Sequence, residues 1–516
     1  MNISKYIKIA AAMLPMLAAT GCNDFLDVQP STETDRDKLF SDEAGYADAM
    51  AGVYSLMSSD ELYGKNMTWY MVELMGGGAA YAGSDGGDIA KFRFHSRADG
   101  FSSTLRDNTV TPIWNKTYNA IANLNAILES IDSKQDVFAG NDYEIFKGEA
   151  IGLRAFLHFD LLRLFGAAYA VDKDYVAIPY VASLTSDVYP RLTVEECCNT
   201  VVEELKQARD LLVHDPMYLD QTPTPYVCGE LTGDVSKRTQ YDIRAWHNRR
   251  FHFNYYAAVA TLARVYLWMG DKVNALGAAK EVIAASDRFR WVDPRLVSNI
   301  VATDNSERDR TFSTEHIFAL NIRDLQDRID GYMYAGRNTF EGTQGNLVGI
   351  NTNCFEVRTR VLDYRYQYQR SSYTYFGSTV VSVSTKYYED PDVMNYSPWA
   401  AHRLPLIKLP EMYYIAAECE PDPTTSAQYL QTVRNNRGLG AVAYGSDNIA
   451  EQIEREYRKE FIAEGQLFYF NKRLNIPTQI FNVFGLYSNA PEMTVSPSVY
   501  ILEIPDEETT YGANGN

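Results

Sequence analysis

Side chains able to act as acids, bases or nucleophiles are abundant in this chain but follow no catalytic spacing. Paired carboxylates occur throughout a sequence with 67 acidic residues, so they carry no information about glycoside hydrolysis. No Ser–His–Asp or Cys–His arrangement is indicated around its 7 histidines and 6 cysteines. The sequence therefore predicts no catalytic residues and a protein that is not an enzyme.

Metal and phosphate sites are equally weakly indicated. His247 and His252 are five residues apart around "NRR", a poor spacing for ligands on one helix face. In "LMGGGAAYAGSDGGD", Asp85 and Asp88 could bind calcium, but a polar turn is favoured. The same stretch lacks the strand–GxGxxG–helix order of a phosphate-binding loop. We expect no bound metal and no cofactor.

The cysteines show no disulfide framework and no CxxC pair. They are Cys22, Cys197, Cys198, Cys228, Cys354 and Cys419. Cys197 and Cys198 are adjacent within a predicted helix and are expected to be packing residues. Only Cys22 has a context that suggests chemistry.

Cys22 follows the three parts of a secretory signal. Lys5 and Lys8 precede the apolar stretch 9–19, and "AATGC" places small residues directly before the cysteine. The apolar stretch is far shorter than the roughly 20 residues that a membrane-spanning helix needs. An ordinary cleavage site is the alternative, but the pattern favours a bacterial lipobox. We predict that residues 1–21 are cleaved and that acyl chains such as palmitate on Cys22 anchor segment 22–40 to a membrane.

Charge excludes one class of partner. The formal net charge is −19, from 48 basic and 67 acidic residues. Cleavage of the signal removes Lys5 and Lys8, which leaves 46 basic residues against 67 and a net charge of −21. Such a surface repels nucleic acid, so we expect no nucleic-acid partner. The 37 tyrosines suit surfaces that stack on ligands, although most are expected to be half-buried.

The elements that must position any site are helical. Ser41 is expected to cap a helix with Asp42 and Glu43 in its first turn. Pro112 is suited to the first turn of a helix that runs to residue 131. Thr193 and Glu196 have the spacing of a capping box before a long apolar stripe.

Helices also occur in pairs. Residues 255–286 form two helices around a turn at Gly270, with small residues that allow close approach: Ala257, Ala260, Ala263, Ala275 and Ala279. Two further pairs are 114–131 with 143–165, and 411–418 with 425–437. The sequence predicts a mostly α scaffold of degenerate tetratricopeptide-like helix pairs, with long loops and a few short strands.

Three irregular regions separate these helices: 75–101, 214–248 and 290–400. Loops of this length are usually functional or disordered, and their aromatic content argues against disorder. "STVVSVSTKYY" in the third region reads as short strands. "EREYRKEF" predicts a solvated helix face with one favourable pair, Glu454 with Arg458, rather than a docking surface.

Several separate motifs follow one another along the chain. They are "CNDFLDVQP", "IWNKTYNAIANLNAIL", "GEAIGLRAFLHFDLLRLFG", "RLTVEECCNTVVEELKQARDLL", "ATLARVYLWMGDKVNALGAAKEVI", "LPLIKLPEMYYIAAE", "IEREYRKEFIAEGQLFYFNKRLN" and "YILEIPDEET". In this order they resemble the SusD/RagB family of outer-membrane nutrient-binding lipoproteins of Bacteroidota. Lys408 stands where arginine is usual, and Glu503 replaces the first proline of the closing motif.

The resemblance implies a lid over a SusC-like, TonB-dependent barrel that imports oligomers across the outer membrane. It implies a surface-exposed, lipid-anchored protein that binds oligosaccharides, with Asp24 and Asp27 resembling the family's surface-export signal. Peptide binding, as in RagB-type members, is an alternative. A helical scaffold that binds only proteins is another.

The resemblance also implies an N-terminal helical region, 41–285, and a C-terminal region, 286–516, with a loop-rich insert at 290–400. The ligand site is expected on the loops of the first and third irregular regions, because stacking needs aromatic side chains on exposed loops, whereas scaffold helices bury theirs. Trp69 and Trp114 lie in apolar helical patterns and are therefore assigned to the core. The candidate ligand-binding residues are Tyr81, Phe92, Phe94, Tyr332, Tyr334, Arg337, Asn338 and Phe340. The glycines 76–78 and the tyrosine-dense segment 364–375 are not family motifs and could encode ligand choice.

Overall fold

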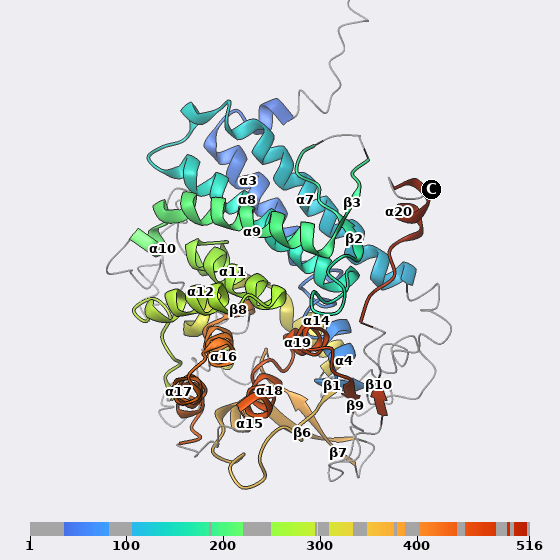
Figure 1. The fold of residues 1–516 in the computed structure, drawn as a ribbon, viewed down its shortest axis with the longest axis vertical. Helices are drawn as coiled ribbons and strands as arrows, with labels where there is room; N and C mark the ends of the chain where they lie inside the picture. The colour runs from blue at the N-terminus through green and yellow to red at the C-terminus, as the bar shows by residue number, and fades with distance from the viewer. Residues whose placement is uncertain are drawn as a thin grey trace, which may run out of the picture.

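The computed structural model describes residues 36–81, 106–184, 188–219, 249–294, 297, 309–333, 348–375, 379–387, 402–440, 449–480, 493–495 and 500–512. Helices are the main elements, and most of the short strands gather in the lower part of the molecule (Figure 1). The prediction of a mostly α fold with a few short strands is confirmed.

The predicted helix pair around Gly270 is present. Helix α11 (Tyr255–Met269) ends at Gly270, whose φ of 81° is a left-handed conformation that glycine adopts at little cost. Helix α12 (Lys272–Ala284) follows after Asp271, whose side chain caps it. The five alanines predicted at this contact are all fully buried. The two backbones therefore pack closely, as the small residues predict.

The long helices stack side by side in chain order. In this stack each helix packs on the next: α3 (Glu43–Met57), α7 (Thr111–Ile131), α8 (Asp142–Phe165), α9 (Val194–Leu211), α11, α12, α16 (Leu409–Cys419) and α17 (Pro423–Asn435). The other two predicted pairs, α7 with α8 and α16 with α17, are thus confirmed. Such a stack buries a continuous core between successive helix pairs.

The other described α-helices are not part of this stack. They are α4 (Met71–Gly76), α10 (Pro216–Leu219), α14 (Leu325–Met333), α15 (Tyr364–Tyr368), α18 (Ile449–Glu460), α19 (Gln466–Arg473) and α20 (Asp506–Tyr511).

Helix starts follow the sequence signals with one exception. The capping box at Thr193 forms, with the Glu196 N–H donating to Thr193 Oγ1 at 3.2 Å. Pro112 lies in the first turn of α7. The prediction of Ser41 as the cap of α3 is wrong, because Asp42 Oδ1 accepts the Gly45 N–H at 3.0 Å. The Ser41 hydroxyl donates to a preceding carbonyl instead.

The described strands form antiparallel two-stranded ladders. The pairs are β1 (Ala79–Tyr81) with β5 (Val348–Ile350), β2 (Val176–Pro179) with β3 (Arg191–Thr193), β4 (His316–Asn321) with β8 (Arg403–Lys408), β6 (Arg370–Tyr375) with β7 (Thr379–Ser384), and β9 (Thr478–Ile480) with β10 (Met493–Val495). Strand β7 confirms the strand predicted from "STVVSVSTKYY".

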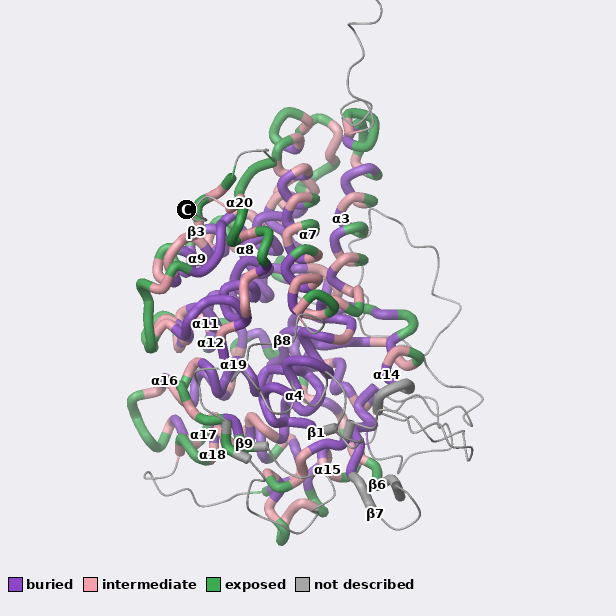
Figure 2. The backbone as a smooth tube through the Cα atoms, turned by 90° about the vertical axis from the view of Figure 1, so that its right-hand side faces the viewer, coloured by how far each residue is buried: buried purple, intermediate pink, exposed green. Residues whose placement is uncertain are grey.

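The centre of the molecule is one large core around α8, which is buried along almost its whole length (Figure 2). Trp69 and Trp114 belong to it, as predicted. The core includes residues from both sides of position 285, from Phe40 to Leu502. The division of the chain at that position therefore stays a prediction.

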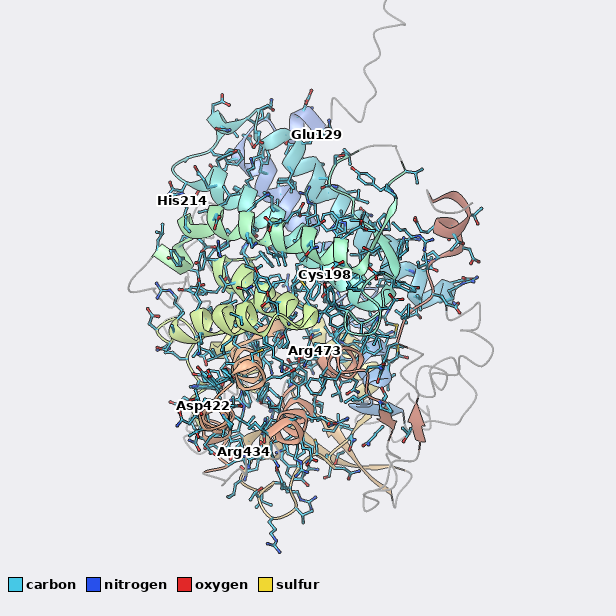
Figure 3. All side chains as sticks on the ribbon, viewed as in Figure 1. Glu129, Cys198, His214, Asp422, Arg434 and Arg473 are labelled. Carbon is cyan, nitrogen blue, oxygen red and sulfur yellow. The ribbon has the colours of Figure 1, made fainter. Side chains whose placement is uncertain are left out.

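The adjacent cysteines of α9 are buried in this core as free thiols (Figure 3 labels Cys198), in agreement with a packing role.

Across the described ranges, no helix is both long enough and apolar enough to cross a membrane.

Candidate functional site

The two predicted ligand loops adjoin the same two-stranded ladder, which β1 and β5 form. Tyr81 ends β1 and pairs with Val348, the first residue of β5. The first loop region continues the chain after Tyr81, and the segment 334–347 joins α14 to Val348. Helix α14 also packs against β5. Two stretches of chain separated by more than 240 residues are therefore brought to one place.

The individual site residues are described only in part. Tyr81 belongs to β1 and Tyr332 to α14, two elements that both contact β5, and the side chains of these tyrosines are outside the described set. Six of the predicted residues lie outside the described ranges altogether: Phe92, Phe94, Tyr334, Arg337, Asn338 and Phe340. Their roles stay predictions.

A buried carboxylate fastens the segment that leads to β1. Glu73 of α4 is 1% exposed, and its two oxygens accept the N–H groups of Ala463 and Gly465, each at 2.9 Å. Burial raises the pKa of Glu73 to about 7, although both N–H donors favour the charged form. Sequence patterns gave no sign of this contact, because its partners lie about 390 positions away.

The glycines at the end of α4 allow other parts of the chain to pack closely against it. Gly77 has a φ of 77°, and a Cβ on it would lie 2.5 Å from the Gln479 carbonyl oxygen. A Cβ on Gly76 would lie 2.6 Å from the backbone nitrogen of Phe468. The glycine run thus lets α4 and β1 approach α19 and β9 closely. These contacts explain the run without assigning ligand choice to it.

A groove of about 480 Å³ lies beside α14, between α3 and the end of β4. Its apolar wall includes Tyr54, Phe146, Phe251 and Leu320, and its polar groups include Ser55, Asn321, Arg323 and Asp324. Within the described ranges the side chains of Asn321 and Arg323 have no hydrogen-bond partner, and both residues are exposed. Aromatic faces next to polar groups are the usual lining of small-molecule sites.

The buried carboxylate of Glu149 bonds two of the residues that line this groove. Glu149 of α8 is fully buried and bonds both His252 Nδ1 and Arg249 Nη1 at 2.8 Å, while the Tyr54 hydroxyl donates to it. Burial alone would raise the pKa of Glu149, but His252 and Arg249 outweigh it and lower the pKa to about 2. Tyr54 and His252 are therefore held in fixed orientations at the groove wall.

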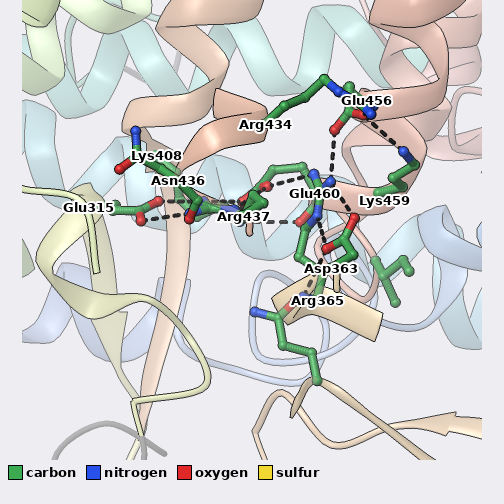
Figure 4. Close-up of polar contacts among 12 residues, drawn as sticks. Glu315, Asp363, Arg365, Lys408, Arg434, Asn436, Arg437, Glu456, Lys459 and Glu460 are labelled. Atoms are coloured by element: carbon green, nitrogen blue, oxygen red, sulfur yellow. Dashed lines mark hydrogen bonds and ion pairs between the residues drawn. The ribbon is translucent and has the colours of Figure 1, made fainter. Parts of the chain in front are cut away.

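The C-terminal half contains a second buried feature, which we name the charge cluster (Figure 4). Its carboxylates are Glu315, Asp363, Glu456, Glu460 and Glu464, and its cations are Arg365, Lys386, Lys408, Arg434, Arg437 and Lys459. All of these side chains are buried.

Glu460 is at the centre of the cluster. It accepts bonds from Arg437 Nη2 at 2.9 Å, from Lys408 Nζ at 3.1 Å and from Arg365 Nη1 at 3.1 Å. Burial opposes its charged form, but these cations hold the pKa of Glu460 well below its ordinary value. The acid is therefore ionised inside the protein.

The prediction of a solvated helix face on "EREYRKEF" is wrong for three of its residues. The predicted Glu454–Arg458 pair forms at 2.8 Å, but Glu456, Lys459 and Glu460 are buried. Local sequence could not indicate this, since their partners come from α15, β8 and α17. Lys408, the departure from the usual arginine, bonds Glu460 and Glu464 and is part of the same cluster.

Metal binding finds no support in the described part of the chain, where no group of three or more His, Cys, Asp or Glu residues could hold an ion. His252 contacts Glu149 instead, and His247, Asp85 and Asp88 lie outside the described ranges.

Comparisons with known proteins agree with this architecture. Residues 24–224 match a SusD-like family described as starch-binding and associating with the outer membrane, and residues 284–511 match the SusD family. No curated protein matches the chain.

Solved structures share the fold along nearly the whole chain. A SusD superfamily protein of Bacteroides thetaiotaomicron has a TM-score of 0.66 at 22% identity, covering 91% of this chain and 98% of its own. A SusD superfamily protein of Bacteroides vulgatus has a TM-score of 0.65 at 20% identity, covering 90% and 96%. A SusD-like carbohydrate-binding protein of Bacteroides vulgatus has a TM-score of 0.64 at 17% identity, covering 93% and 96%.

Proposed function

Because the chain belongs to the SusD family, whose members are binding proteins that do not catalyse reactions, we propose that it is a lipid-anchored protein of the outer-membrane surface that binds oligosaccharides. It delivers the bound oligosaccharide to a SusC-like, TonB-dependent transporter for import. Cys22 carries the acyl chains, and the folded part stays in water above the membrane.

The observation that carries this proposal is the pairing of Tyr81 with Val348. It brings the start of one aromatic-containing loop, after Tyr81, next to the end of another, segment 334–347. Helix α14, which precedes that segment, packs against β5. Sugar rings present apolar C–H faces that stack on aromatic side chains, and polar neighbours then bind the hydroxyl groups. We assign stacking to Tyr81, Phe92, Phe94, Tyr332, Tyr334 and Phe340, and hydrogen bonding to Arg337 and Asn338.

Two comparisons favour oligosaccharides over peptides. The family matched by residues 24–224 is described as starch-binding, and the relative from Bacteroides vulgatus with a TM-score of 0.64 is a carbohydrate-binding protein. Tyrosine-rich loops supply the stacking surfaces that such ligands use.

Alanine substitution tests the assigned site. Tyr81→Ala and Tyr334→Ala are each expected to weaken oligosaccharide binding by a few-fold to about tenfold, since one stacking contact contributes about 0.5–1.5 kcal/mol. The change is measured by calorimetric titration of the purified protein. Thermal unfolding checks that both variants stay folded.

The matched control is Tyr218→Ala, because Tyr218 is 39% exposed on α10, away from the β1–β5 ladder (Figure 1). Binding by this variant is expected to equal that of the parent. Unchanged affinity in both Tyr81→Ala and Tyr334→Ala would move the site elsewhere, first to segment 364–375.

The transporter is the second part of the proposal. A surface protein that captures a ligand imports nothing without a channel, so we expect a stable complex with a SusC-like barrel. Affinity purification from cells that express both proteins, in mild detergent, should recover the pair. Recovery of this protein alone would count against the partnership.

A further inference from the structure

Two arginines, Arg360 and Arg370, contact the same aromatic ring, that of Tyr366. Arg360 and Arg370 lie on the two sides of segment 364–368, and their guanidinium carbons are 5.2 Å and 4.1 Å from the centre of the Tyr366 ring. Both side chains are partly exposed, as is Tyr366. Two cations therefore share one aromatic ring at the surface.

Neither cation has a carboxylate partner within the described ranges. Arg370 donates only to neutral oxygens: to Ser372 Oγ at 2.9 Å, to Ser382 Oγ at 3.2 Å and to the Tyr366 carbonyl at 3.4 Å. For the Arg360 guanidinium the structure gives no hydrogen bond to a described residue, only the contact with the ring. Burial, joined by the charge of Arg360, lowers the pKa of Arg370.

The nearby acids are engaged elsewhere. Asp363 bonds Arg365 through both oxygens, at 2.9 Å and 2.8 Å. Glu356 bonds Lys459 at 2.7 Å and 2.9 Å. In a chain with a net charge of −19, the surface positive charge near Tyr366 is thus left without a compensating anion among the described residues.

This group lies near the ligand loops of the proposed function. Arg370 begins β6, which pairs with β7, and β7 packs against β5, the partner of β1. The Tyr366 ring also contacts Phe355, which follows β5, at 5.2 Å. Both Figure 1 and Figure 2 show α15, β6 and β7 next to β1 in the lower part of the molecule.

Resting on the proposed function, we propose that Arg360 and Arg370 form an anion-binding subsite that selects oligosaccharides carrying carboxylate or sulfate groups. A guanidinium binds either group through two parallel N–H donors. The Tyr366 ring orients both guanidinium groups before the ligand arrives, which lowers the entropic cost of binding. Arg358, two residues before Arg360 in the chain, is also exposed.

The test compares matched ligands with the purified full-length mature protein in mild detergent. The probes are an oligogalacturonide, the same oligomer with its carboxylates reduced to alcohols, and a sulfated chondroitin oligosaccharide. At least one anionic probe is expected to bind at least about tenfold more tightly than the reduced oligomer, as one charge-assisted hydrogen bond allows. The uronate and sulfate arms show which anion is preferred.

Arg360→Gln and Arg370→Gln are each expected to weaken anionic binding by about tenfold while leaving the neutral oligomer unaffected. Arg360 is the safer substitution, because Arg370 also donates hydrogen bonds to Ser372 and Ser382 in the β6–β7 ladder. Arg209→Gln is the control and should bind like the parent, because the Arg209 side chain is 36% exposed on α9, outside this group of arginines.

Two outcomes overturn the subsite: equal affinity for the acidic and reduced oligomers, or unchanged anionic binding in both arginine variants. In either case neutral oligosaccharide binding would leave the proposed function intact. Binding of no oligosaccharide, neutral or anionic, would contradict the proposed function and the subsite together.

Discussion

Replacing Glu460 with alanine is expected to lower the free energy of unfolding by about 3–5 kcal/mol, the usual cost of breaking a buried ion pair. The side chain is 1% exposed and bonds three cations, Arg365, Lys408 and Arg437, which the substitution would leave inside the protein without this acid. The loss is measured by equilibrium denaturation at neutral pH, where the native acid is ionised.

The matched control lies on the same helix. Glu454 is 36% exposed and, among the described residues, pairs only with Arg458 four residues later, so Glu454→Ala should cost no more than about 0.5 kcal/mol. Glu460→Gln retains the shape of the side chain and serves if the alanine variant does not fold. Equal destabilisation by Glu454→Ala and Glu460→Ala would show that the charge cluster does not stabilise the fold as described.

The second large effect is expected at the anchor. Cys22→Ala removes the thiol that would carry the lipid, so the protein should leave the outer-membrane fraction almost completely. A single acyl chain already contributes about 0.8 kcal/mol per buried methylene, and the substitution removes that contribution. The fractions are compared by immunoblotting after cell lysis and a high-salt wash.

Cys354→Ala is the control for this experiment, because Cys354 is a free thiol far from the N-terminus. That variant should remain with the membrane. Persistence of Cys22→Ala in the washed outer membrane would show that another feature anchors the protein and that the lipobox assignment is wrong.

Periodic apolar patterns were sufficient to predict the helical scaffold. The pair around Gly270 and the capping box at Thr193 depend on residues within one or two turns of each other, and such local signals appear directly in sequence. The error at Ser41 is equally local, since two adjacent residues can both cap a helix and only the backbone geometry decides between them.

The charge cluster could not be predicted in the same way. Glu456 and Glu460 are on a helix whose sequence is typical of a solvated face, and their burial depends on arginines from 22 to 95 positions away. The role of Glu73 has the same origin, because its N–H donors lie in a distant turn. Long-range pairing of charges leaves no periodic signal.

The candidate site could be predicted from the sequence only in part. Its loops were located from composition and from the family resemblance, and the ladder between Tyr81 and Val348 shows how two distant segments meet. Positive charge without a described carboxylate partner around Tyr366 was not predicted, because the sequence alone does not show which cations the neighbouring acids pair with. Only the contacts of Asp363 and Glu356 reveal that these acids are already used.

The central claim is that this protein binds oligosaccharides at the loops around β1 and α14. Calorimetric titration of the purified protein against neutral oligosaccharides, anionic oligosaccharides and peptides of similar length tests it most directly. The account predicts saturable binding of at least one oligosaccharide, which Tyr81→Ala or Tyr334→Ala weakens, and no saturable binding of the peptides. Saturable binding of peptides with none of any oligosaccharide would contradict it.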